Sequence, residues 1–380
     1  MDISKMKIVI NCWVLRNKNL DGIGYFTINT LQRIIQTHPD VSFIILADKN
    51  FTESYFDFKN VTIQRVFPPY RHPLLYILYF EFILPFVLRK IKPALFVSAE
   101  GFLSLFSSCK QLPLIYDLNF EHYPENLAFK NRLYFGFFFK RFAKKATRIA
   151  TISEYSKADI IQLYKIAPGK VDNVSCGINS NFYILSEKER FATCEKYSAG
   201  IPYFFFVGSM HPRKNMLRLL KAFDEFKKIS GSNFKLLIAG TMVWNQSEIL
   251  AAYESSAYKN DIHFTGRLSD DELKLLLGAA YALTFVPIFE GFGLPIVEAF
   301  EAGVPVLAGN ATSLPEVAGN AAIYADPFDV NSIAAGMNEL YENKNELCSS
   351  LIKKGFEQKK LFSWDRTAAL LWDSMQKAIQ

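Results

Sequence analysis

The chain has 380 residues, enough for two domains of ordinary size, each with a buried core of its own. Its 43 basic and 37 acidic residues give a net charge of +6, a balance too even to indicate a nucleic-acid-binding protein. Hydrophobic residues make up 50% of the chain and aromatic residues 15%, more than a core needs, which raises the question of an apolar surface.

The cysteines and the N-terminus indicate a protein that stays inside the cell. Five scattered cysteines, an odd number without CxxC or Cys/His spacing, are typical of reduced thiols and argue against a structural zinc site. The first apolar run, KIVINCWVL, is too short for a secretory signal and leads into Arg16 without a small-residue cleavage site. We therefore expect it to be the first strand of a cytoplasmic protein.

Short apolar runs separated by segments of helical pattern follow one another through the first half of the chain. They read KIVINC, VSFIILA, VTIQRV, ALFVSA, LPLIYDL and RIATIS. This alternation predicts a parallel α/β sheet with crossover helices, and we expect residues 1–180 to form one Rossmann-like, doubly wound domain.

A polar stretch interrupts this rhythm, and residues 181–200 are predicted to be a linker. The rhythm then resumes with YFFFVGS, FKLLIAG, IHFTG, YALTFVP, VPVLAG and AAIYA, which predicts a second Rossmann-like domain over residues 201–362. Ser363 is placed to cap a closing helix over residues 363–380. The predicted fold class is therefore α/β, with two doubly wound domains facing a central cleft, where the carboxyl ends of their strands would bind ligands.

The stretch FEGFGLPIVEAFEAGVPVL, from Phe289, predicts a strand-to-helix junction suited to an anion. Gly291 and Gly293 allow close approach of the backbone, and the helix start adds partial positive charge, so a diphosphate would bind well there. Glu290 precedes the helix and Glu298 lies about one turn inside it, so the two acids can flank one ligand and accept hydrogen bonds from sugar and ribose hydroxyls. The alternative is a solvated Glu298 and a Glu290 that only complements the helix dipole.

A second strand, turn and helix begin at Phe206 with FVGSMHPRKNMLRLLKAF. Arg213 and Lys214 stand at the helix start, where cations are unfavourable unless an anion is bound nearby. The alternative is two solvated basic side chains.

These two blocks, with IHFTGRLSDDELKLLL and the lead-out GVPVLAGNATSLPEVAGNAAIYADPFD, resemble retaining glycosyltransferases of family 4, also called glycosyl transferases group 1. The resemblance implies a GT-B fold with the donor in the second domain and the acceptor against the first. It assigns the donor diphosphate to Lys214, with Arg213 beside it. It further implies a donor site that includes Glu290, Glu298, Gly291, Phe292, Gly293, Leu294, Gly208, Ser209, Arg267 and Leu268.

The first domain carries weaker matches to the same family. LDGIGYFTINTL resembles its glycine-rich loop after the first strand, with Gly22 and Gly24 at the acceptor and phosphate side. Thr27 stands where a dinucleotide-binding GxGxxG would need glycine, which disfavours a dehydrogenase. In LIYDLNFEHYPE, Tyr116 and Asp117 stand where many relatives have His-Asp, and FEHYPE resembles mannosyltransferase-type members. Tyr116 can donate a hydrogen bond to the transferred sugar but cannot titrate like histidine near neutral pH.

The resemblance thus predicts a retaining, metal-independent hexosyltransferase, with mannose favoured. Its donor would be a GDP- or UDP-linked sugar, with no further cofactor, and its acceptor a hydroxyl of a surface polysaccharide or lipid-linked glycan precursor. The predicted catalytic residues are Glu290, Lys214, Arg213, Tyr116 and Asp117. No Asp-x-Asp occurs, which agrees with the absence of a metal site. The alternatives are a GT-B epimerase or phosphorylase, and an inactive nucleotide-sugar-binding subunit.

Two aromatic-rich segments of the first half bear on location. The apolar run from Pro73 to Leu88 has only 16 residues and contains Glu81, so it is too short to span a membrane. FKNRLYFGFFFKRFAKKATR, from Phe129, interleaves aromatic residues at helical intervals with Lys130, Arg132, Lys140, Arg141, Lys144 and Lys145. Such a helix either lies on an anionic cytoplasmic membrane face, or packs its aromatic side chains into the core with the basic ones solvated.

Overall fold

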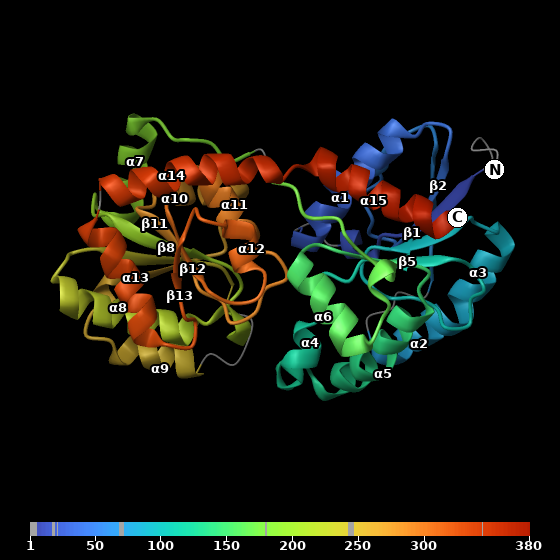
Figure 1. Ribbon diagram of the computed structural model, residues 1–380, viewed down its shortest axis with the longest axis horizontal. Helices are drawn as coiled ribbons and strands as arrows, with labels where there is room; N and C mark the ends of the chain where they lie inside the picture. Colours follow the sequence, from blue (N-terminus) through green and yellow to red (C-terminus); the bar gives the residue numbers. More distant parts are fainter. Residues whose placement is uncertain are drawn as a thin grey trace. The chain divides into compact units, whose positions relative to one another are not determined.

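The computed structural model describes residues 6–16, 20, 22–67, 72–178, 181–241, 247–343 and 345–380. It divides into two compact units: unit 1 comprises Met1–Gly177 with Ser363–Gln380, and unit 2 comprises Ile178–Phe362. Figure 1 shows a parallel sheet with helices in each unit. The predicted α/β class with two Rossmann-like domains is confirmed.

Unit 1 contains a five-stranded parallel sheet in the order β3-β2-β1-β4-β5. Its strands are β1 (Lys7–Asn11), β2 (Ser42–Ala47), β3 (Val61–Arg65), β4 (Leu95–Ser98) and β5 (Gln111–Pro113). A two-stranded parallel sheet of β6 (Ile149–Thr151) and β7 (Val171–Asn173) continues it through a bridge between Leu114 and Ala150. The strand order reverses between β1 and β4, where doubly wound sheets bind ligands.

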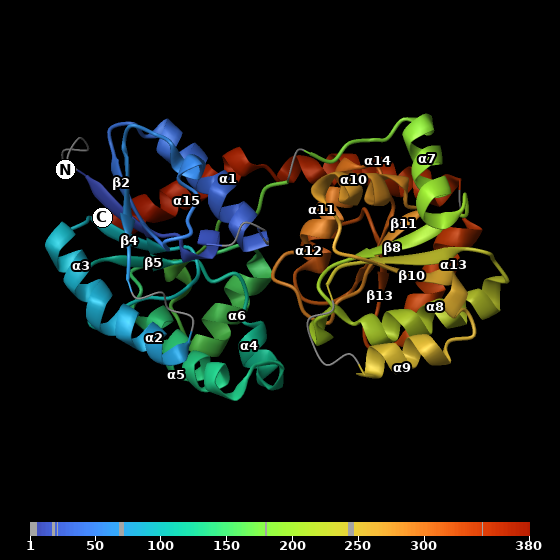
Figure 2. The same cartoon turned by 180° about the vertical axis from the view of Figure 1, so that it is seen from behind.

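Helices cover both faces of this sheet, because strand residues alternate between the two faces. On one face α1 and α15 lie side by side, and on the other lie α2, α3 and α5 (Figure 1 and Figure 2). The helical segments are α1 (Gly22–Thr37), α2 (Pro73–Ile77), the π-helical η4 (Leu78–Ile83), α3 (Leu84–Ile91), α4 (Asn119–His122), α5 (Phe129–Lys145), α6 (Glu154–Tyr164) and α15 (Trp364–Ile379). Short 3-10 turns are η2 (Trp13–Arg16), η3 (Glu53–Phe56), η5 (Pro124–Asn126) and η6 (Pro168–Lys170).

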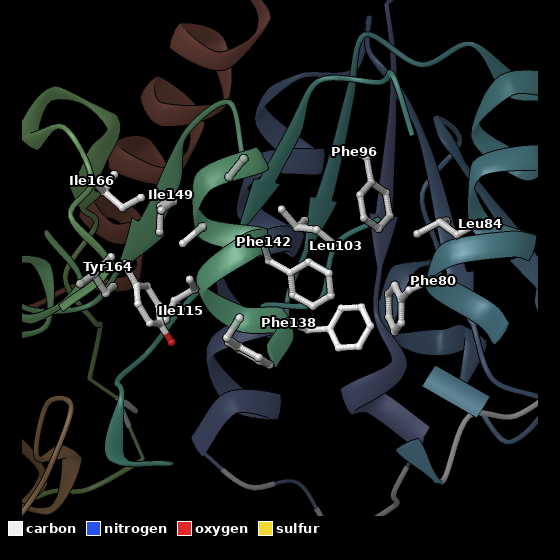
Figure 3. Packing of buried hydrophobic residues seen from close by; sticks show 14 of the residues in the cluster. Phe80, Leu84, Phe96, Leu103, Ile115, Phe138, Phe142, Ile149, Tyr164 and Ile166 are labelled. Carbon is white, nitrogen blue, oxygen red and sulfur yellow. The ribbon is translucent and has the colours of Figure 1, made fainter. Parts of the chain in front are cut away.

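The aromatic residues of unit 1 fill much of its core. Phe138 and Phe142 of α5 point toward Phe80 and Leu84, and Figure 3 shows Phe96 of the sheet beside them. The rings of Phe138 and Phe142 lie 5.5 Å apart, a distance typical of favourable aromatic pairs. One face of α5 is therefore firmly anchored to unit 1.

Unit 2 has a six-stranded parallel sheet in the order β10-β9-β8-β11-β12-β13. Its strands are β8 (Tyr203–Val207), β9 (Lys235–Ala239), β10 (Ile262–Gly266), β11 (Ala282–Phe285), β12 (Val306–Gly309) and β13 (Ile323–Ala325). Its helices are α7 (Glu187–Ser198), α8 (Met216–Ser230), α9 (Ser247–Ser255), α10 (Asp270–Ala279), α11 (Leu294–Glu301), α12 (Leu314–Ala318), α13 (Val330–Glu342) and α14 (Glu346–Gln358), with 3-10 turns η7 (Pro212–Lys214), η8 (Lys259–Asp261) and η9 (Lys359–Leu361). Here the strand order reverses between β8 and β11.

The predicted linker over residues 181–200 is corrected by the structure, because it contains α7 and belongs to unit 2. Ser186 and Glu189 form a capping box at its start, and Tyr197 Oη donates a hydrogen bond of 3.2 Å to Glu272 of α10. The segment is polar because α7 lies on the surface of unit 2, and not because it is a linker. The closing helix α15 starts after Ser363, whose Oγ accepts from Arg366 N, and it packs on unit 1.

Candidate functional site

The strongest candidate residues gather where the order of strands reverses in unit 2. Strands β8 and β11 pair directly, so the loops that follow them start side by side. The β8 loop carries Gly208 and Ser209 and ends in η7 with the predicted basic pair, and the β11 loop carries residues 290–293 into α11. Crevices at such reversals are where open α/β sheets bind ligands.

Glycine is required at the ends of β8 and β9 because these loops run in close contact. A Cβ atom at Gly240 would lie 1.9 Å from the carbonyl oxygen of Gly208, and both glycines have positive φ. A Cβ at Gly208 would be 3.6 Å from Cε of Lys214, so the Lys214 side chain passes directly over this turn. Ser209 beside it is exposed.

Glu290, Lys214 and Arg213 form one ion-pair cluster, called here the charge triad. Lys214 Nζ contacts Glu290 Oε1 directly, and Arg213 Nη1 lies 2.9 Å from the same oxygen. Glu290 is 8% exposed and Lys214 9%, so the pair is almost fully buried. Burial alone would raise the pKa of Glu290, but the two cations together hold it below its usual value. Two cations and one carboxylate leave the triad with one positive charge, which suits an anion.

Backbone contacts hold the two loops of the triad together. Ile288 N donates to Arg213 O at 2.8 Å, and Arg213 Nη1 donates to Phe289 O at 3.0 Å. Asn215, in the left-handed region at φ 65°, donates through Nδ2 to Val286 O at 2.9 Å and to Pro327 O at 2.6 Å. The basic pair is thereby fixed against the β11 loop, an arrangement that preorganises the site.

The Gly-Phe-Gly turn is anchored from the loop that precedes α12. Glu290 N donates to Thr312 Oγ1 at 3.2 Å, and Ser313 Oγ donates to the carbonyl oxygens of Glu290 and Phe292 at 2.9 and 3.0 Å. Gly293 caps α11 at φ 108°, where a Cβ would lie 2.7 Å from Leu314. The sequence predicted no role for Thr312, Ser313 or Asn215, although two of them lie in the quoted lead-out GNATSLPEVAG.

Glu298 lies in an environment opposite to that of Glu290. It is partly buried on α11, and burial together with the nearby charge of Asp270 raises its pKa to about 7. Asp270 begins α10, directly after the loop that carries exposed Arg267 and half-buried Leu268. Two carboxyl groups whose environments move their pKa values apart are typical of a functional site.

The candidates of unit 1, Tyr116 and Asp117, are held by hydrogen bonds to their own domain. Tyr116 Oη donates to Ala99 O at 3.0 Å, at the carboxyl end of β4, and its ring meets Phe26 edge to face at 5.4 Å. Asp117 Oδ1 accepts from the backbone N and Nδ2 of Asn119 at 3.0 and 2.6 Å, so it closes a turn. His122 Nε2 lies 2.9 Å from Asp159.

Gly22 and Gly24 do not form the expected glycine-rich loop, because both lie in the first turn of α1. Gly22 is exposed and Gly24 is buried. Residues 17–19 and 21, on which the rest of that expectation falls, lie outside the described residues.

The described part of the chain has neither a cluster of metal-binding side chains nor a membrane-spanning helix. Within these residues, no group of three or more His, Cys, Asp or Glu side chains is arranged to hold a metal ion. The same residues contain no helix with the length and apolar character needed to cross a membrane.

Two Rossmann-like units, with an anion-suited charge triad at a strand reversal of the second, fit the two-domain architecture of GT-B glycosyltransferases. Residues 195–358 match the model of glycosyl transferases group 1, and residues 20–182 match that of glycosyltransferase family 4. The chain therefore belongs to the GT-B glycosyltransferases of family 4 and is mannosyltransferase-like.

Curated relatives agree with this family. The O-antigen chain mannosyltransferase B of Escherichia coli is 32% identical over 223 residues, which cover 58% of this chain and 58% of the relative. The O-antigen chain mannosyltransferase RfbU of Salmonella typhimurium is 28% identical over 219 residues, 57% of each chain. The matches thus span a little over half the length of these relatives.

Solved structures share the fold over nearly the whole chain. Anabaena Alr3699/HepE, in complex with UDP and glucose, aligns with a TM-score of 0.76 at 13% identity and covers 98% of this chain and 99% of its own. WaaG, a glycosyltransferase involved in lipopolysaccharide biosynthesis, aligns with a TM-score of 0.73 at 15% identity, over 96% of this chain and 98% of its own. At such identities the likeness shows the fold alone.

Proposed function

We propose that this protein is a retaining glycosyltransferase that transfers a hexose, with mannose favoured, from a GDP- or UDP-linked sugar to a hydroxyl of a surface polysaccharide or its lipid-linked precursor. The observation that carries the proposal is the charge triad at the β8/β11 reversal. The similarity to O-antigen mannosyltransferases supports the choice of sugar and of glycan, and the UDP complex of Alr3699/HepE supports a nucleoside diphosphate in this fold.

The donor diphosphate would bind at the triad, because Lys214 and Arg213 exceed the charge of Glu290 by one. A phosphate oxygen there would make charge-assisted hydrogen bonds to the two cations, which are roughly twice as strong as neutral ones. Their contacts with Glu290 would weaken in return, leaving its carboxylate to accept a hydroxyl of the transferred sugar. Glu298, with its raised pKa, would accept a ribose hydroxyl from the other side of the turn.

In the proposed reaction the acceptor oxygen attacks the anomeric carbon from the face that the diphosphate leaves. The bond from the anomeric carbon to the phosphate oxygen breaks with its electron pair, and the proton of the acceptor hydroxyl passes to a phosphate oxygen. The anomeric configuration is retained. The protein contributes positioning and stabilisation of the charge that develops on the leaving diphosphate, mainly through Lys214 and Arg213.

We further propose that no cofactor or metal ion takes part, since the cations of the triad can stabilise the leaving group. The enzyme would work at the cytoplasmic face of a membrane, where a lipid-linked acceptor would be presented.

Transfer from GDP-mannose and UDP-sugars to a lipid-linked glycan acceptor, followed by NMR, tests the proposal directly. We expect the product to keep the anomeric configuration of the donor and the rate to be unchanged by EDTA. Conversion of the sugar without transfer would favour an epimerase, and a requirement for inorganic phosphate would favour a phosphorylase. Nucleotide binding without any cleavage of the donor would instead indicate a binding subunit.

A further inference from the structure

Unit 1 exposes a row of large apolar side chains along one continuous helical segment. Leu74, Leu78, Phe82 and Phe86 recur every fourth residue through α2, η4 and α3, and they are 69%, 43%, 63% and 72% exposed. The opposite side of the segment is the core face, with Tyr79, Phe80 and Leu84 buried. A spacing of four keeps one face of a helix, and the wider π-helical turns of η4 keep the row aligned.

A second row lies on α5. Phe129, Leu133 and Phe137 again follow at intervals of four and are 71%, 58% and 51% exposed. The expectation of core packing is thus met by Phe138 and Phe142, whereas these three side chains are exposed and the membrane expectation stays a prediction. The two helices that carry the rows pack together, with the rings of Tyr76 and Tyr134 5.2 Å apart.

A buried carboxylate holds a further phenylalanine beside the first row. Glu81 is 4% exposed, and its Oε2 accepts from the backbone N of Leu105 at 2.8 Å and of Phe106 at 3.3 Å. The Phe106 side chain is 70% exposed, and its ring lies 6.3 Å from that of Phe82. A carboxylate in the middle of an apolar segment therefore serves to fix an apolar side chain at the surface.

Basic side chains accompany both rows. Arg89, Lys90 and Lys92 follow the first, and six accompany the second: Lys130, Arg132, Lys140, Arg141, Lys144 and Lys145. All nine are exposed. The only acidic residue in residues 73–92 and 129–145 is the buried Glu81. Apolar rows with a basic border and no exposed acid are complementary to a lipid surface that carries negative charge.

We infer that these two rows and Phe106 form the surface by which the protein docks on a bilayer containing anionic lipid, with the phenylalanines inserted at the headgroup boundary. The inference rests on the proposed membrane location, but not on the donor or the reaction. A second copy of this chain is a poorer occupant, because a two-fold interface would place the nine basic side chains opposite one another. The rows are also too short to span the membrane.

Sedimentation with vesicles of phosphatidylglycerol and phosphatidylcholine tests this surface without any donor or acceptor. We expect the protein to bind at low salt and to bind phosphatidylcholine alone far more weakly. Changing Lys140, Arg141, Lys144 and Lys145 to glutamine should lower the partition coefficient well over tenfold, since each basic side chain near such a surface contributes roughly fivefold. The matched control changes Lys188, Lys221, Lys353 and Lys354, all exposed in unit 2, and should bind nearly as wild type.

Insertion is separated from simple charge attraction by tryptophan fluorescence. Phe82→Trp should give a blue-shifted emission on adding vesicles and be quenched by lipids brominated on their acyl chains. Phe191→Trp, at a 68% exposed position of α7, should show neither. The triple variant Phe82→Ser, Phe86→Ser, Phe106→Ser should lose vesicle binding while keeping its Tm and its rate of donor hydrolysis, because these side chains are exposed.

Three results would overturn the inference. The wild-type protein could stay in the supernatant with anionic vesicles at low salt. The Phe191→Trp probe could respond as strongly as Phe82→Trp. Sedimentation velocity could show a dimer that the triple variant dissociates, which would make this face a contact between copies. A protein that binds vesicles but does not cleave nucleotide-sugars would contradict the proposed function and leave the docking surface intact.

Discussion

The strand reversals of the two sheets carry different chemistry. In unit 2, the β8/β11 reversal is bordered by a nearly buried carboxylate paired with two cations. In unit 1, the carboxyl end of β4 carries a neutral hydrogen bond, from Tyr116 Oη to Ala99 O, and is followed by Glu100. A fixed cluster of charge is suited to a ligand whose own charge is constant, such as a diphosphate. A half-buried tyrosine hydroxyl is instead suited to an acceptor recognised through its own hydroxyl groups.

The largest effect that would test this contrast is expected from Lys214→Ala. The change lowers the net charge of the triad from +1 to zero and removes a contact to phosphate worth about 1.5 to 3 kcal/mol. We expect donor affinity and kcat/KM to fall together by roughly 10- to 100-fold, measured by calorimetry with GDP and UDP and by turnover. Lys221→Ala, at an exposed position of α8, is the control. Unchanged affinity and full activity would remove the diphosphate from this site.

Glu290→Gln tests the role of the carboxylate separately from that of the two cations. Because Glu290 offsets part of the positive charge of Lys214 and Arg213, its neutralisation should not weaken nucleotide diphosphate binding and should tighten it. Turnover should fall roughly tenfold, if the contact of the carboxylate with the sugar contributes about 1.5 kcal/mol in the transition state. The signature is a lower kcat with an equal or smaller Kd for the nucleotide. A larger Kd for the nucleotide with a normal kcat would show that Glu290 serves only to hold the basic pair in place.

Glu298 makes donor binding depend on pH in a predictable direction. Its pKa of about 7 means that the carboxylate, the better acceptor for a ribose hydroxyl, is lost as pH falls below 7. We expect the Kd of the donor to rise between pH 8 and pH 6 in the wild type and to be flatter in Glu298→Gln. The control is Glu301→Gln, on the same helix and paired with Lys359 in the wild type. Its donor Kd should depend on pH as that of the wild type does.

The raised pKa of Glu298 also predicts how the stability of the folded protein changes with pH. The pKa of Glu298 is raised in the folded state, so its protonated form is favoured by folding. The contribution to stability is present below the unfolded pKa and is lost as pH rises through about 7. The Tm of Glu298→Gln should therefore increase relative to wild type between pH 5 and pH 8. A difference that shrinks over this range would contradict the raised pKa.

The strands, loops and helix starts of unit 2 were largely predictable, because residues close together in the sequence determine them. Glycines at strand ends, a proline at the start of α11 and the basic pair at a helix start mark the reversal before any tertiary contact is known. The direct pairing of Lys214 with Glu290 was not predictable, since 76 positions separate them and no local pattern encodes the contact. The supports at Thr312 and Ser313 were missed for the same reason, and the helix α7 because its polar composition resembles a linker.

The smallest effect is expected from Tyr116→Phe. Its interpretation needs two measurements, because the hydroxyl both stabilises the fold and is a candidate contact to the transferred sugar. Tyr116→Phe removes the hydrogen bond to Ala99 O, which should lower the free energy of unfolding by about 0.5 to 1.5 kcal/mol. Nucleotide affinity should not change, because the residues of the proposed diphosphate site all belong to unit 2. If the hydroxyl also donates to the transferred sugar, turnover should fall severalfold beyond any loss of folded protein, and Tyr116→His should restore part of it with a new dependence on pH near 6.5. A variant that is less stable but equally fast per folded molecule would assign Tyr116 to the fold alone, and unit 1 would then contribute its surface to the acceptor without contributing this hydroxyl to the reaction.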